Sequence, residues 1–159
     1  ASALIQIGEN LKAGMDRMTM QNDVAFGSYI IDPVNTINNV DLFSPTGGGI
    51  TAPSEAMGAT PGTDHWLYPT GAVPGIGTSS AEQLSLLRVS AGVCTEINSK
   101  VNSVATAAGA DLGDFTTTGA DIPSGKMANW QLTGKTIGCV NNTNSASAGT
   151  YFYEVLFIQ

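Results

Sequence analysis

The stretch from residue 1 to residue 26, ASALIQIGENLKAGMDRMTMQNDVAF, carries a single apolar stripe. Apolar side chains recur at the spacings that place them on one face of an α-helix. The stripe consists of Leu4, Ile7, Leu11, Met15 and Met18. Gly8 and Gly14 lie inside the same stretch, and each costs a helix interior about 1 kcal/mol relative to alanine. We therefore predict an amphipathic helix over residues 1–26 that needs a sheet or another helix to pack on.

The chain after this stretch is predicted to consist of long loops and short strands. Gly27 suits the left-handed conformation that ends many helices, so we expect the first helix to stop there. Residues 33–78 are dense in Gly, Pro, Thr and Asn, a composition typical of loops. Within them, residues 65–68, HWLY, form the most strand-like run. We expect surface loops at residues 46–61 and 141–149.

The second half of the chain carries a helix signal between strand signals. The run of apolar residues at 82–89 is too short for periodicity to distinguish a strand from a helix. We predict a strand, because Ser90 is a good N-cap and the apolar residues after it have helical spacing. A second helix follows at about residues 91–102. Residues 150–158, rich in Tyr, Phe, Val and Ile, predict a strand in mid-sheet or at a well-covered edge, in a hairpin with residues 138–140.

Together these signals predict an α+β fold in a single domain over residues 1–159. A chain of this length buries roughly two thirds of its unfolded surface, which is enough for one core. The N-terminal amphipathic helix at residues 1–26 packs on an antiparallel β-sheet. Residues 27–159 supply the sheet, the second short helix and the long loops rich in Gly, Pro and Thr.

The charge of the chain argues against polyanionic partners. The formal net charge is −7, and the six Lys and Arg residues are not clustered. No basic stripe is therefore present to neutralise phosphates, so we predict no nucleic-acid partner and no binding to anionic membrane surfaces. No apolar run in the sequence reaches the roughly 20 residues that cross a bilayer.

Two cysteines, Cys94 and Cys139, stand in a chain that is rich in Ser, Thr and Asn and poor in Lys. An even count in such a chain suits an oxidising compartment and favours a disulfide. The alternative is two unrelated buried thiols. A zinc site is disfavoured, because a chain with one His holds no compact set of Cys and His ligands.

Catalytic residue sets are not evident in the sequence. The one histidine, His65, lies in a predicted strand beside Trp66, where a structural role is the simpler interpretation than that of a catalytic base. Asp111, Asp114 and Asp121 are the best candidates for a carboxylate pair, although Asp beside Gly is typical of turns. A small secreted hydrolase stays open as an alternative on these residues. We predict no enzyme activity, no cofactor and no metal.

Several short blocks resemble the globular part of type IV pilins and pseudopilins of Gram-negative bacteria. The end of the first helix, with NDVAFG at residues 22–27, resembles the end of the pilin spine helix as it enters the first loop. The other blocks are HWLY at 65–68, IGT at 76–78, VCTEIN at 93–98, GC at 138–139 and YFYEVL at 151–156. The order of helix, Gly-rich middle, sheet and cysteine-closed C-terminal region is also similar to that family.

The resemblance implies a structural subunit of a type IV pilus or pilus-like secretion filament. Its partners would be other pilin subunits, and an apolar membrane-embedded half of the spine helix would precede residue 1. Such a subunit is anchored in the inner membrane before assembly and lies in an extracellular filament afterwards. The alternative within this family is a minor pilin or adhesin that recognises a surface or glycan. Its candidate contact residues are Trp66, Tyr68 and Trp130.

Overall fold

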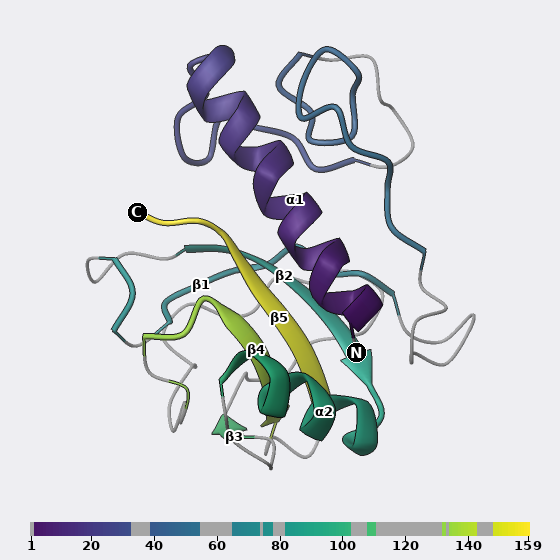
Figure 1. Ribbon diagram of the computed structural model, residues 1–159. Coiled ribbons are helices and arrows are strands. Elements are labelled where there is room, and N and C mark those ends of the chain that lie inside the picture. Colours follow the sequence, from purple (N-terminus) through teal and green to yellow (C-terminus); the bar gives the residue numbers. More distant parts are fainter. Residues whose placement is uncertain are drawn as a thin grey trace.

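The computed structural model describes residues 2–32, 39–54, 65–73, 75–77, 82–102, 108–110, 132, 134–142 and 148–159. The fold is α+β, with an N-terminal helix, a second helix and one sheet (Figure 1). In chain order the elements are α1 (Ser2–Gln21), β1 (Thr70–Gly71), β2 (Glu82–Val89), α2 (Ala91–Val101), β3 (Ala108–Ala110), β4 (Ile137–Asn142) and β5 (Gly149–Phe157).

The sheet has the strand order β1-β2-β5-β4-β3. Its centre is β5, which pairs antiparallel with β2 on one side and with β4 on the other. The predicted hairpin of the last two strands is confirmed by the β4–β5 pairing. The short edge strand β3 runs parallel to β4, so the prediction of a purely antiparallel sheet is wrong at this edge and right for the other four strands.

Both helices cover the same face of the sheet. In Figure 1, α1 runs obliquely over the sheet and α2 lies over the end where β5 begins. Phe152 and Leu156 of β5 pack with the buried side of the helices. Tyr151 and Tyr153 lie in the cluster on the opposite face, with Leu67, Val73, Ile76 and Leu132 from the connecting segments. Burial from residue 151 to residue 156 is continuous because β5 is covered on both faces.

Helix α1 ends at Gln21 and not near Phe26, so the predicted spine helix of residues 1–26 is too long. The backbone at Asp23 takes a positive φ of 52°, a left-handed conformation that stops the helix. The backbone N–H groups of Asn22 and Val24 both donate to the carbonyl of Met18. Gly27 also adopts a positive φ, but in a separate turn that follows the helix.

The predicted strand and helix around Ser90 are confirmed. β2 covers residues 82–89, and α2 follows it with Ser90 as the N-cap, whose hydroxyl accepts a hydrogen bond from the Val93 N–H at 3.3 Å. The predicted strand at residues 65–68 is reduced to one bridge between Leu67 and Leu86, and the regular strand β1 begins at Thr70.

Candidate interaction site on the N-terminal helix

Helix α1 lies close against the sheet at Gly8. A Cβ atom at this position would lie 2.9 Å from Cζ of Phe152 and 3.0 Å from Oε2 of Glu154. Real Cβ atoms hardly ever come that close to a neighbour, so the glycine is what lets the helix backbone lie directly on β5. We call Gly8, Phe152 and Glu154 the α1–β5 seam.

The apolar stripe of α1 forms the rest of this contact. Gly14 repeats the close approach on the flank of the helix, where a Cβ would lie 3.0 Å from Leu42 Cδ1 and 3.1 Å from Ile50 Cγ2. Of the predicted packing residues, Ile7 is only partly buried and packs against the edge of the core. The other four are fully buried, namely Leu4, Leu11, Met15 and Met18.

The opposite face of α1 is exposed and nearly neutral. Its ionic side chains alternate in sign, and at its edge the half-buried Lys12 pairs with the exposed Asp16 one turn later at 3.3 Å. Arg17 donates to Gln21 at 3.3 Å with the same spacing. Such pairs each stabilise a helix by about 0.2–0.5 kcal/mol, which is too little to hold α1 in place without the sheet. Met20 is 84% exposed near the end of this face, an unusual position for a large apolar side chain.

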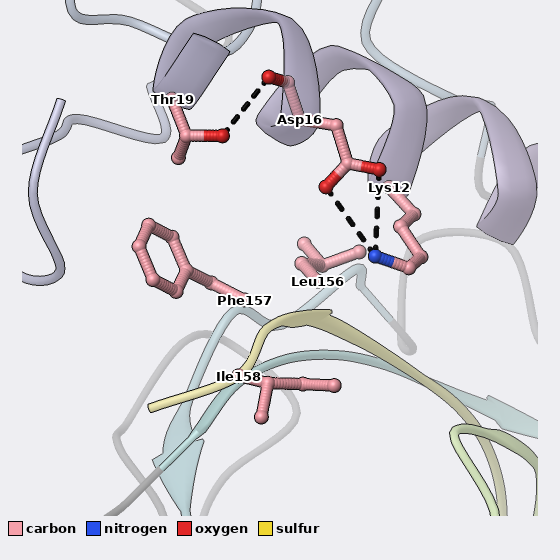
Figure 2. A pocket seen from close by; sticks show the side chains of 6 residues that line it. All are labelled: Lys12, Asp16, Thr19, Leu156, Phe157 and Ile158. Carbon is pink, nitrogen blue, oxygen red and sulfur yellow. Dashed lines mark hydrogen bonds and ion pairs between the residues drawn. The ribbon is translucent and has the colours of Figure 1, made fainter. Parts of the chain in front are cut away.

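A pocket of about 220 Å³ lies between α1 and the last residues of β5. Figure 2 shows the Lys12 ammonium directed at the Asp16 carboxylate above the backbone of β5. Thr19 donates its hydroxyl proton to the Asp16 carbonyl at 2.9 Å. The full lining consists of Lys12, Asp16, Thr19, Leu156, Phe157 and Ile158. A second pocket of about 180 Å³ lies on the other flank of α1, against residues 50–54.

The carboxyl group of Glu154 is buried in the seam. The residue is 1% exposed, and its Oε2 has no hydrogen-bond partner among the residues that the structure describes. Burial raises the pKa of Glu154 to about 8, and the nearby Glu9 carboxylate adds to the rise while Lys12 opposes it. Asp41 and Glu82 are also buried with one unpaired oxygen each. The second carboxylate oxygen of Asp41 accepts a hydrogen bond from the backbone N–H of Phe43, and that of Glu82 accepts one from the backbone N–H of Val73.

The predicted disulfide is present and ties α2 to β4. Cys94 and Cys139 are both buried, with their Cα atoms 5.3 Å apart. One turn after Cys94, the buried side-chain amide of Asn98 forms hydrogen bonds with both the backbone carbonyl and the backbone N–H of Cys139. Its Nδ2 donates to the Cys139 carbonyl at 2.8 Å, and its Oδ1 accepts from the Cys139 N–H at 2.9 Å. Asn98 thus pairs with β4 as a neighbouring strand would, a role that the sequence analysis missed.

Of the aromatic residues predicted to contact a surface or glycan, the two that the structure describes, Trp66 and Tyr68, are not exposed. Trp66 is 8% exposed, stacks edge-on against Phe152 with 6.1 Å between ring centroids, and donates its indole N–H to the Ser54 carbonyl at 3.0 Å. The prediction of a surface role is therefore wrong for Trp66, which is a core residue. Tyr68 is half-buried against Phe43. Trp130 lies outside the described residues.

The candidate carboxylates of a hydrolase, Asp111, Asp114 and Asp121, also lie outside the described residues. His65 is half-buried just before the Leu67 bridge. Within the described part of the chain, no three His, Cys, Asp or Glu side chains gather in a way that suits a metal ion. The described helices likewise include none that is both long and apolar enough to span a membrane.

Comparison of the chain with protein-family models, with curated proteins and with solved structures gives no match.

Proposed function

We propose that this chain is a structural subunit of a type IV pilus or pilus-like secretion filament. In this proposal its partners are other subunits, and it is held at the inner membrane before it enters an extracellular filament. The sequence blocks that resemble pilins support the proposal, and so does the arrangement of the helices on one face of the sheet.

The observation that carries the proposal is the two-sided environment of α1. One side of the helix is fixed to β5 through Gly8 and the buried stripe. The other side is exposed along the whole helix, with charged side chains of both signs and one exposed methionine. A helix held rigidly on its own domain and open on its outer side suits lateral packing against the same helix of a neighbouring subunit.

Single added thiols are expected to distinguish the outer side of α1 from the far side of the sheet. Ala13 is exposed on α1. Lys135 is exposed on the other side, where its carbonyl accepts a hydrogen bond from the Tyr153 hydroxyl at 2.9 Å. Because both native cysteines are joined to each other, Ala13→Cys or Lys135→Cys adds the only free thiol.

In filaments sheared from cells that make the protein, we expect a bulky maleimide to label Lys135→Cys and to leave Ala13→Cys at least about tenfold less modified. Subunits dissociated in detergent serve as the control, because both thiols are then expected to react at similar rates. Equal labelling in the filaments, or failure of the protein to enter any filament, would contradict the proposal.

A further inference from the structure

Glu154 is an acid placed where the fold leaves no room for a hydration shell. On the helix side of β5 it lies between Phe152 and Leu156, both buried in the core. Its Oε2 faces Gly8, because a Cβ at that glycine would lie 3.0 Å from this oxygen. A hydrated carboxylate needs several water molecules, so an ionised Glu154 requires α1 to move away from the strand.

Within the described part of the chain, the one cation that acts on the Glu154 carboxyl is already paired with another acid. The charged groups of α1 that act on it are Glu9, which has the same sign, and Lys12. Its partners across the sheet, Ser85 on β2 and Ile137 on β4, carry no charge. Lys12 is already engaged with Asp16, at 3.3 and 3.4 Å from the two carboxylate oxygens. The closed α1–β5 seam therefore favours the neutral, protonated form of Glu154.

We propose that Glu154 is a proton-controlled switch for the docking of α1. Its neutral form lets the helix lie on β5 at Gly8, and loss of the proton to solvent loosens the seam and draws Lys12 away from Asp16. The pocket of Lys12 and residues 156–158 is the side from which water enters. This inference concerns the helix and strand alone and does not depend on the proposed filament.

The direction of the pH dependence follows from the raised pKa of Glu154. The folded form titrates near 8 and the free side chain near 4.5, so between these values the folded protein holds more proton than the unfolded chain. Stability is therefore greatest below about pH 4.5 with respect to this group and falls as the pH rises towards 8. The unfolding equilibrium constant increases by up to about tenfold per pH unit in that window.

Carboxyl-carbon NMR of uniformly labelled protein measures the switch directly. The Glu154 signal, assigned by its loss in Glu154→Gln, is expected to titrate with a midpoint near pH 8. Glu9→Gln removes the like charge and is expected to lower the midpoint by roughly half a unit, whereas Lys12→Met removes the opposite charge and raises it by a similar amount. Glu9 is exposed and Lys12 is half-buried at the pocket, so neither side chain belongs to the buried core.

Fluorescence of Trp66 reports whether the seam opens with the same midpoint. Trp66 touches Phe152, the ring that lies under Gly8, and a Trp130→Phe background leaves it as the single tryptophan. We expect a change in emission between about pH 6 and about pH 10 that Glu154→Gln abolishes. The ionisation of Tyr29 falls outside this range, because burial raises the pKa of Tyr29 to about 12.

Three results would overturn the switch. The first is a Glu154 midpoint near 4.5, the ordinary value of the group. The second is a midpoint that neither Glu9→Gln nor Lys12→Met moves. The third is a fluorescence transition that survives unchanged in Glu154→Gln, which would assign it to another group.

Discussion

Replacing both Cys94 and Cys139 with serine is expected to lower the free energy of unfolding by about 4 kcal/mol. The disulfide closes a loop across a sequence separation of 45, for which the loss of chain entropy in the unfolded state gives about this value. A native Cα separation of 5.3 Å lies within the usual range, so the bond needs no displacement of α2 or β4. Urea denaturation followed by far-ultraviolet circular dichroism measures the difference.

The control for this prediction is the native sequence after reduction. Reduced protein and the double serine variant are expected to have the same midpoint, because both lose the same constraint on the unfolded chain. Asn98 keeps its two hydrogen bonds to the backbone of residue 139 in both proteins, so α2 should stay on β4 below the midpoint. A loss smaller than about 1 kcal/mol would contradict a structural role of the disulfide.

Alanine at Gly8 in α1 and alanine at Gly92 in α2 are expected to change stability in opposite directions. At Gly8 the new Cβ meets the fully buried Phe152 ring at 2.9 Å, so the helix or the strand must shift. Overpacking of this kind costs about 1–3 kcal/mol, and this exceeds the gain of about 1 kcal/mol in helix propensity. We expect Gly8→Ala to destabilise the protein, and Gly8→Val to do so more.

Gly92 is the matched control in α2. It is exposed, and an added Cβ would find nothing within 4 Å, so Gly92→Ala gains helix propensity without a clash. We expect it to raise the free energy of unfolding by about 0.5–1 kcal/mol. Thermal and urea unfolding of Gly8→Ala and Gly92→Ala measure the two changes in the free energy of unfolding. A Gly8→Ala protein that is as stable as Gly92→Ala would show that α1 does not lie on β5 as described.

The parts of the fold that follow a regular period were predictable from the sequence. The buried stripe of α1 repeats at helical spacing, and the apolar residues after Ser90 do the same, so both helices could be placed. Residues 149–157 are strongly strand-forming, and the structure makes them the central strand. The end of α1 was not predictable, because it depends on a single residue in the left-handed conformation, Asp23. From the sequence alone, Gly27 was the better candidate for that conformation, because glycine adopts it without strain.

The contacts that define the candidate site depend on tertiary structure and were not predictable. Sequence alone treats Gly8 as a weak point of a helix, whereas in the fold it lies so close to β5 that an added Cβ would meet Phe152 at 2.9 Å. Asn98 looks like an ordinary polar residue of a short helix until β4 is placed beside it. Glu154 carried one signal, a lone acid within the apolar run of residues 151–157, but its face of the sheet was not known.

Trp66 also shows that the role of a residue depends on tertiary contacts that the sequence does not reveal. A tryptophan in a Gly-rich and Pro-rich region suggests an exposed binding residue, yet the Trp66 ring packs on Phe152 and its indole N–H donates to the Ser54 carbonyl. The role of Trp66 depends on its contact with Phe152, which is far away in the sequence, and the local composition around Trp66 cannot predict that contact.

Native-state hydrogen exchange of the α1 amides tests the central claim, that the sheet holds this helix in place. At about pH 6, where Glu154 is neutral, we expect the amides of residues 8–18 to exchange with opening free energies close to that of global unfolding. An isolated helix of this length with two internal glycines would be marginal in water. Exchange within about tenfold of unstructured-peptide rates across these residues would contradict the docked helix and, with it, the proposed subunit.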